Sequence, residues 1–242
     1  MERDDGRSPI AVVGRVRGRS RRRLLLGIGA IAVLVCLAVL LALVPLGVLG
    51  LVVDDSARFE ATPAVPDDAT LSATGYELDG ADTVTVERHR TVAGQDRTIA
   101  VANPQRVYRK DVRVGDRTVP GGVFATVATP AIEIAGSPRN PVAAESHSEL
   151  LGRFQSRLGA GENSSFRAVS TREAVLVGSR TTVTTFETTV TVDGERRAFA
   201  VYVTTARSNG DVVVAVGGHP TAFPDERVAI VRLIYAVEVG AR

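Results

Sequence analysis

The chain has 242 residues and a net charge of +2, and the charge is unevenly distributed. Residues 1–23 hold eight of the 29 basic and three of the 27 acidic residues. No charge occurs in 24–53, so the remainder carries 21 basic against 24 acidic residues, a net of −3. A folded part without a basic excess argues against a nucleic-acid partner. The only cysteine, Cys36, precedes that part, which excludes disulfides and a cysteine nucleophile from it.

An apolar stretch at 24–53 predicts one transmembrane segment, because about 20 apolar residues already span a bilayer as a helix. Six arginines lie between Arg15 and Arg23, and Asp54 and Asp55 follow the stretch. The positive-inside rule therefore predicts a cytoplasmic N-terminus and an outside C-terminal domain, at the cell membrane. The sequence therefore predicts four parts: a cytoplasmic basic tail at 1–23, a transmembrane segment at 24–53, a tether at 54–66 and an exterior domain at 67–242.

The sequence is compatible with two interpretations of the arginines that precede the apolar stretch. The run from Ser20 to Leu25, with three arginines before two leucines, resembles a twin-arginine export signal. Any arginine cluster beside a span also satisfies the positive-inside rule, and the two interpretations are equally supported.

The first half of the exterior domain reads as one short helix followed by strands. Asp67 or Asp68 offers an N-cap for a helix that reaches Thr74, and Gly75 is placed to end it. From Thr83 onwards, apolar and polar residues alternate as in a half-buried strand. Extended runs are expected at 83–92, 98–114 and 123–134, with turns at 93–96, at 115–116 and at 120–122.

The second half predicts a helix and then a meander. Leu150, Leu151, Phe154 and Leu158 fall on one helical face. Strands are expected at 166–177, 181–192, 195–205 and 212–216. Asp193-Gly194 and Asn209-Gly210 are strong hairpin signals. The stretch 225–239 is ambiguous, and its start after Pro224 favours a helix over a strand.

These elements predict an α+β fold, in which an antiparallel sheet of about six or seven strands packs with two or three helices. The strand at 212–216 is apolar on both faces. The centre of the sheet should therefore be covered on both sides, either by helices or by a second copy of the chain, so self-association is a candidate property.

Few residues are candidates for chemistry, and the chain contains three histidines. His219 follows two glycines at a strand end, where a ligand can approach the backbone, and it is the candidate ligand contact. His147 lies between Glu145 and Glu149, but this spacing does not place the three on one helical face, so no metal site is predicted. His89 reads as part of a solvated strand face. No catalytic or cofactor motif occurs, so neither a catalytic residue nor a cofactor is predicted.

One modification site is a candidate. Asn163-Ser164-Ser165 forms an N-glycosylation sequon within a glycine-flanked stretch of the predicted exterior domain. Sequons also arise by chance, so Asn163 is a candidate acceptor only.

Four stretches carry a family resemblance. They are 71–77 (LSATGYE), 140–142 (NPV), 181–187 (TTVTTFE) and 212–220 (VVVAVGGHP). Together they resemble an uncharacterised family of exported, membrane-attached haloarchaeal proteins, over about residues 59–239. Many members resemble lipoproteins, whereas this chain has a full apolar span. The resemblance implies no function.

The sequence favours a membrane-anchored binding or interaction domain over an enzyme. The alternatives are a surface-anchored hydrolase or transferase, with His219 and His147 as its only acid or base candidates, and a structural cell-envelope component. The partners expected from the sequence are the lipid bilayer and envelope proteins or polymers.

Overall fold

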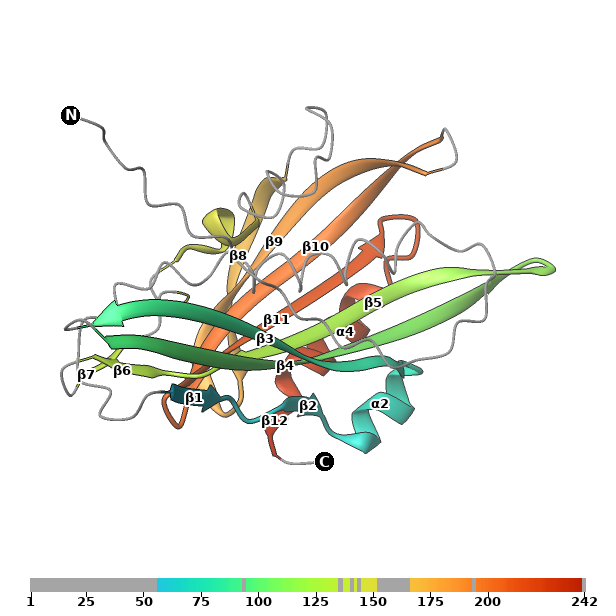
Figure 1. Cartoon of the computed structure of the whole chain (residues 1–242). Coiled ribbons are helices and arrows are strands. Elements are labelled where there is room, and N and C mark those ends of the chain that lie inside the picture. Colours follow the sequence, from blue (N-terminus) through green and yellow to red (C-terminus); the bar gives the residue numbers. More distant parts are fainter. Residues whose placement is uncertain are drawn as a thin grey trace, which may run out of the picture.

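The computed structural model describes residues 56–92, 95–134, 137–139, 142, 145–151, 166–192 and 195–240. These residues form a mostly β domain built on one eight-stranded sheet (Figure 1). Its strands are β1 (Ser56–Glu60), β3 (Glu77–Val92), β4 (Gln95–Val114), β5 (Arg117–Thr129), β8 (Arg167–Leu176), β9 (Ser179–Val192), β10 (Glu195–Ser208) and β11 (Asp211–Pro220). The predicted transmembrane segment at 24–53 lies outside the described residues.

Strand order is β1-β4-β5-β11-β10-β9-β8, with β3 paired to β4. The sheet is mixed and mainly antiparallel, because β1 pairs in parallel with β4. The sequence predicts an α+β fold on an antiparallel sheet of about six or seven strands. The mainly antiparallel sheet of about this size is confirmed, whereas the parallel β1–β4 pair was not predicted and the described domain is mostly β, with few helices. Residues of the predicted tether form β1 and the short strand β2 (Ala64–Pro66). Two parallel strands need a long connection, which residues 61–94 provide between β1 and β4. Local sequence patterns do not reveal such a pairing between distant segments.

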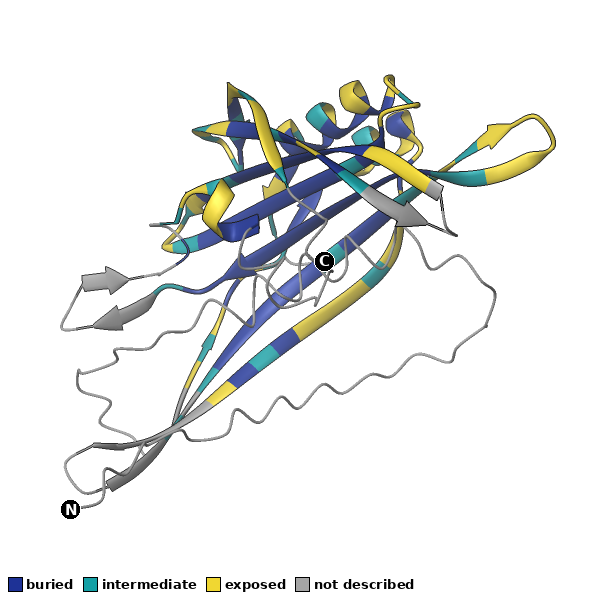
Figure 2. Cartoon of the chain, turned by 90° about the horizontal axis from the view of Figure 1, so that it is seen from above, coloured by how far each residue is buried: buried dark blue, intermediate teal, exposed yellow. Residues whose placement is uncertain are grey.

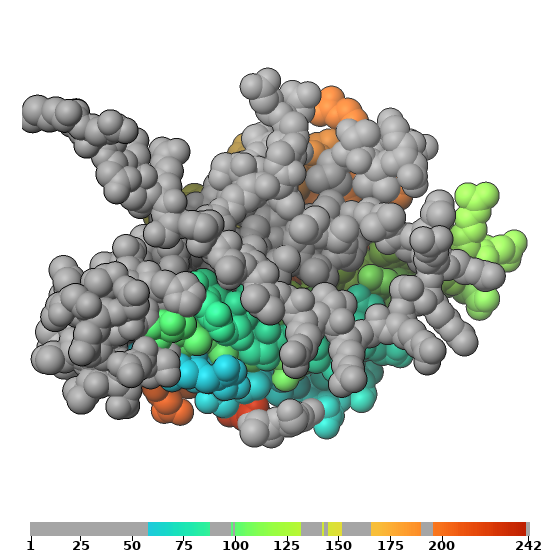
Figure 3. Space-filling view, in the orientation of Figure 1, coloured from blue at the N-terminus to red at the C-terminus, as the bar shows by residue number. Residues whose placement is uncertain are grey.

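Two helices and two small sheets complete the described domain. The helix α2 spans Asp68–Thr74, and α4 spans Glu226–Tyr235. The strand β2 pairs with β12 (Val237–Val239), and β6 (Ile132–Ile134) pairs with β7 (Ser137–Arg139). Figure 3 shows the C-terminal residues, in red, at the surface beside the light blue residues that begin the described chain.

The ends of α2 confirm the prediction made from its caps. The Asp67 carboxylate accepts a hydrogen bond from the Thr70 backbone N–H at 2.7 Å. Gly75 ends the helix with a φ of 72°, a left-handed conformation that glycine adopts without steric cost. Both signals are local, which explains why sequence alone locates this helix to the residue.

The stretch 225–239 contains both a helix and a strand, so the single predicted helix is a partial error. The helix α4 ends at Tyr235, and Val237–Val239 then pair with β2. The Asp67 N–H donates to the Ala236 carbonyl at 3.1 Å, which ties the end of α4 to the start of α2. Two β-branched valines and a distant partner strand outweigh helical periodicity here.

The prolines of β4 and β5 lie where the ladder tolerates them. Pro104 falls between the part of β4 that pairs with β1, up to Ala102, and the part that pairs with β5, from Gln105. The predicted turn at 120–122 is a β-bulge instead. Lys110 pairs with Gly122 and Asp111 with Pro120, so Gly121 is the additional residue.

The centre of the sheet is buried on both faces, as the sequence predicts. On one face, α2 and α4 pack over residues such as Tyr108, Phe124 and Val213. On the other, Leu150 and Leu151, in the helical residues 147–151, pack against Val201, Val214 and their neighbours. The rest of the predicted helix, with Phe154 and Leu158, lies outside the described residues. Figure 2 shows this burial along the middle of the strands and exposure towards the β4–β5 hairpin.

Close packing between α4 and the sheet requires Gly217 on β11. A Cβ added at Gly217 would lie 2.3 Å from Cγ2 of Ile230 and 3.3 Å from its Cβ. Gly80, in β3, has no atom within 4 Å of such a Cβ and offers a matched control.

We predict that Gly217→Ala destabilises the domain by about 1–3 kcal/mol, because an overpacked core has to move a helix or distort side chains. Gly80→Ala should change stability by less than about 0.5 kcal/mol, as surface substitutions usually do. Chemical denaturation of the purified full-length chain measures both. Equal stability of the two variants would contradict the close packing of α4 on β11.

Candidate functional site

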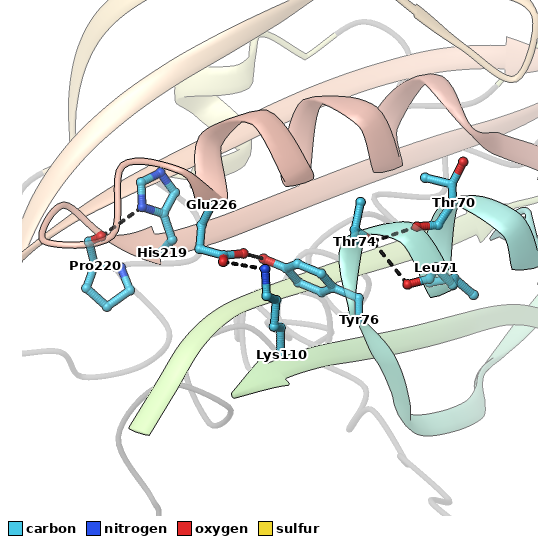
Figure 4. Close-up of polar contacts among 8 residues, drawn as sticks. All are labelled: Thr70, Leu71, Thr74, Tyr76, Lys110, His219, Pro220 and Glu226. Carbon is cyan, nitrogen blue, oxygen red and sulfur yellow. Dashed lines mark hydrogen bonds and ion pairs between the residues drawn. The ribbon is translucent and has the colours of Figure 1, made fainter. Parts of the chain in front are cut away.

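His219 lies at the end of β11, and its side chain is buried, with 3% of its surface exposed. Its Nδ1 donates to the Pro220 carbonyl at 2.8 Å, since a carbonyl oxygen can only accept (Figure 4). In the neutral ring, Nε2 therefore accepts from the Tyr202 hydroxyl, 3.1 Å away. The two rings stack with centroids 5.7 Å apart. The residue that the sequence singles out as a ligand contact thus uses both nitrogens within the domain.

Burial lowers the pKa of His219 below its ordinary value of 6.5. The Pro220 carbonyl and the charge of Glu226 oppose this shift by raising the pKa, and Arg227 adds to it. The neutral imidazole is the favoured form at neutral pH, consistent with an acceptor role for Nε2.

A cluster of three polar residues, Tyr76, Lys110 and Glu226, lies beside His219 (Figure 4). Lys110 Nζ is 2.6 Å from Glu226 Oε1, and the Tyr76 hydroxyl donates to Glu226 Oε2 at 3.1 Å. The Glu226 side chain is only 4% exposed, whereas that of Lys110 is 26% exposed. Both carboxylate oxygens therefore have a partner, which a buried charge requires.

Each member of this cluster comes from a different element. Tyr76 follows α2, Lys110 lies on β4 and Glu226 is the first residue of α4, where an acidic side chain also suits the helix dipole. Burial, followed by the charge of Glu226, raises the pKa of Tyr76, so the phenol remains a donor. A Cβ at Gly122 would lie 2.1 Å from the Tyr76 hydroxyl, so only glycine fits beneath it.

His147 lies on the opposite face of the sheet from His219. Its Nδ1 is 2.8 Å from the Thr184 hydroxyl, and Thr184 pairs with Val203, whose side chain belongs to the second core cluster. His219 pairs with Ala200, which belongs to the first. Burial lowers the pKa of His147. The two histidines proposed as acid and base of an enzyme are therefore not brought to one site.

Of the remaining candidate residues, His89 lies in a described strand and Asn163 does not. His89 pairs with Thr98 in the β3–β4 ladder. Asn163, the candidate glycosylation site, lies outside the described residues. Among the residues that the structure does describe, no group of three or more His, Cys, Asp or Glu side chains is arranged to hold a metal.

A groove lies between α2 and α4, and sequence reasoning did not identify it. Two hollows, of about 550 and 310 Å³, share Ala73 and Arg232 in their linings. The first is lined by Asp67, Ala69, Thr70, Ala73, Val231, Arg232, Tyr235 and Ala236, and the second by Ala73, Thr74, Lys110, Asp225, Val228, Ala229 and Arg232. The two hollows adjoin at these shared residues and are together called here the α2–α4 groove.

The α4 side of this groove carries exposed apolar side chains. Val228 is 55% exposed and Tyr235 is 52% exposed, and they lie seven residues apart, on one helical face. Val231 lies between them, partly exposed. Within the described part of the chain, no acidic side chain forms an ion pair with the exposed Arg232. An exposed apolar stripe next to a hollow indicates an interaction site more strongly than scattered exposed residues do.

The fold and groove together define a mostly β domain that presents two helices on one face of its sheet. The chain belongs to the family described as Domain of unknown function (DUF6517), whose model matches residues 63–238. The match begins just before β2 and ends within β12, so it includes the α2–α4 groove and leaves out β1. No curated protein matches the sequence. In the part of the chain that the structure describes, no helix has the length and apolar character needed to cross a membrane.

We predict that stability falls as the pH decreases through about 6.5, because both His219 and His147 have lowered pKa values in the folded state. Below the ordinary value of 6.5 the unfolded chain binds protons first, so protonation favours unfolding; above it both states are neutral. Each histidine contributes at most about 1.4 kcal/mol per pH unit. Replacing His219 or His147 with Asn should weaken the dependence of stability on pH, which thermal unfolding at several pH values measures. An unchanged pH dependence in the double variant would contradict the prediction.

The Lys110–Glu226 pair gives a second prediction. Glu226→Gln leaves the Lys110 ammonium without its carboxylate and should cost about 3 kcal/mol, the lower end of the range for a broken buried pair, because Lys110 retains contact with solvent. Adding Lys110→Met should recover part of that loss, which a double-mutant cycle on the purified chain measures. Glu238→Gln, at an exposed position of β12, is the control. Equal effects at Glu226 and Glu238 would show that the pair does not hold the elements together.

Proposed function

We propose that this chain is a single-pass membrane protein whose exterior domain recognises a partner protein through the α2–α4 groove. The occupant we propose is a segment of the partner that carries apolar side chains and a carboxylate. The observation that carries this proposal is the stripe of exposed Val228 and Tyr235, with the partly exposed Val231 between them, beside two adjoining hollows that both have Arg232 in their lining.

Membrane attachment rests on the sequence. The apolar stretch at 24–53 exceeds the length of one span, and arginines precede it while aspartates follow it. In this topology the domain lies outside the cell, and its first strand begins three residues after Val53.

Shape and chemistry support a protein segment as the occupant. The helix α2 contributes the small side chains of Ala69 and Ala73, one turn apart, which allow another backbone to approach closely. Across from them, the ring of Tyr235 and the side chains of Val228 and Val231 supply apolar contact. Amphipathic segments bind such grooves through apolar anchors spaced along one face.

Arg232 supplies the charge complementarity. It lines both hollows and is exposed. A guanidinium binds a carboxylate with two parallel hydrogen bonds, which fixes the orientation of the bound segment. Nearby polar groups are engaged within the domain: Glu226 with Lys110 and Tyr76, and His219 with Tyr202 and Pro220. These contacts favour recognition over chemistry at this face.

Site-specific photo-cross-linking tests this proposal. We expect a photoreactive amino acid at Val231 to give one defined adduct in intact cells that produce the full-length chain, and the same probe at Val114, an exposed residue of the β4–β5 hairpin, to give none. Sequencing the adduct by mass spectrometry should identify a partner segment with apolar and acidic residues.

Variants of the groove separate recognition from chance contact. Arg232→Glu should reduce the adduct by about tenfold or more, since losing a charge-assisted bidentate contact costs about 1.5–3 kcal/mol. Arg113→Glu, on the exposed end of β4, is the matched charge control and should leave the adduct unchanged. An adduct of the chain with itself, or one that survives Arg232→Glu, would contradict the proposal.

A further inference from the structure

The first turn of α4 places an arginine on the flank of the helix that faces away from α2. Arg227 and Arg232 lie about 140° apart around the helix axis, because successive residues are about 100° apart. The buried face of α4, which includes Leu233, lies between them. Arg232 lines the α2–α4 groove, so the exposed Arg227 lies on the opposite flank. A cation near a helix N-terminus opposes the helix dipole, so α4 itself gains nothing from this charge.

The strand β8 brings a second arginine to the same face of the sheet. Arg172 is exposed and pairs with Val183, which belongs to the first core cluster together with residues of α4. Side chains of directly paired residues lie on one face of a sheet, so Arg172 lies on the face that α4 covers. The end of α4 reaches this strand, where the Tyr235 hydroxyl donates to the Glu173 carbonyl at 3.4 Å. Arg172 therefore lies one residue from the contact between α4 and β8.

Both arginines lie near one buried hydroxyl group, that of Tyr202. The Tyr202 side chain is 4% exposed, and its hydroxyl is 3.1 Å from Nε2 of His219. Burial raises the pKa of Tyr202, whereas the positive charges of Arg227 and Arg172 lower it. A charge has this effect only at short range, because solvent screens more distant charges. Two elements far apart in the sequence thus place a guanidinium near the same hydroxyl.

Neither of these two arginines forms an ion pair with an acidic residue of the described chain. On β9, Glu187 lies on the same face but is bound to Arg167. On α4, the Glu226 carboxylate is bound to Lys110, and Asp225 lines the groove on the other flank. Two positive charges near one hydroxyl repel each other, and an anion bound to both replaces this repulsion with attraction. The two arginines therefore offer a position for an anionic group.

Two further hydroxyl groups lie on this surface. Ser170 pairs with Thr185, and Thr185 pairs with Tyr202, so the three form one row across β8, β9 and β10 on the face of the arginines. Ser170 and Thr185 are half-buried, and each hydroxyl can donate to an oxygen of a ligand. Ser170 follows a β-bulge at Val169. Bulges are frequent next to functional sites, where they redirect side chains.

The groups of this surface match a phosphate better than a carboxylate. Two guanidiniums carry two positive charges, which balance a phosphate dianion but exceed the charge of a carboxylate. A phosphate ester has three terminal oxygens, which accept hydrogen bonds from both guanidiniums and both hydroxyls together, whereas a carboxylate has two oxygens. Arginine also binds phosphate through two parallel hydrogen bonds, which fixes the orientation of the phosphate.

We infer that Arg172 and Arg227, with the hydroxyls of Ser170 and Thr185, form a binding site for the phosphate group of a small molecule. This site lies on the opposite flank of α4 from the α2–α4 groove, and it depends neither on that groove nor on membrane attachment. The free phosphate ion and a small phosphate ester share the required chemistry, and their relative affinities distinguish the two sources.

Isothermal titration calorimetry on the purified full-length chain tests this site. In a phosphate-free buffer at about pH 8, where phosphate is largely a dianion, we expect saturable binding of inorganic phosphate or glycerol 3-phosphate and none of acetate at equal ionic strength. Tighter binding of glycerol 3-phosphate would identify an ester as the ligand, and tighter binding of inorganic phosphate would identify the free ion. If neither phosphate binds, or if acetate binds as tightly, the inference is overturned.

Charge variants locate the bound phosphate. Arg172→Gln and Arg227→Gln should each weaken binding by about tenfold or more, because each removes charge-assisted hydrogen bonds. Arg232→Gln, on the groove flank of the same helix, and Arg180→Gln, at an exposed position of β9, are the matched controls and should leave the affinity unchanged. Thermal unfolding checks that each variant is folded. Equal affinities in all four variants, whether retained or lost, overturn the inference.

The histidine resonances provide a readout that requires no variant. The chain has three histidines, so the spectrum of selectively labelled histidine is simple. Because Arg227 lowers the pKa of His219, a phosphate bound to Arg227 should raise that pKa, which a pH titration followed by NMR measures. His147, on the opposite face of the sheet, is the internal control, and its pKa should not change. Equal shifts at both histidines, or no shift at His219 in saturating phosphate, would place the phosphate elsewhere and overturn the inference.

Discussion

The ion pair between Lys110 and Glu226 determines how the helices sit on the sheet. The Glu226 carboxylate is 4% exposed and needs partners for both of its oxygens to stay charged. Lys110, on β4, and Tyr76, two residues after the end of α2, are these partners. Since Glu226 begins α4, both helices are fixed relative to one strand. The hydrogen bond from the Asp67 N–H to the Ala236 carbonyl then ties their other ends together. The groove between them is a consequence of these contacts.

Sequence reasoning predicted best where the structure depends on neighbouring residues. Asp67 and Gly75 define α2 because a cap is a contact within a few positions. The Asn209-Gly210 turn joins β10 to β11 with φ values of 51° and 91°, which these two residues adopt at little cost. Apolar character on both faces at 212–216 predicted burial on both sides, because a strand exposed on one side would carry polar residues there.

The parts that sequence reasoning missed depend on residues far apart in the chain. Nothing in the sequence around Lys110 indicates its ion pair, because its partner, Glu226, lies 116 positions later in a helix. The stretch before α2 resembles a linker because strands of three to five residues carry little periodicity, and their partners are β4 and β12. The groove could not be predicted either, because exposed Val228 and Tyr235 have the same apolar character as core residues, and only the packed structure separates the two.

The path of the chain separates its first strand from the α2–α4 groove. From Ser56 the chain runs along β1 away from the β3–β4 turn, continues through β2 and then enters α2. Both helices that line the α2–α4 groove therefore follow the parallel strand in the chain. The polar groups beside the groove are engaged within the domain, so binding a partner there requires no reactive side chain.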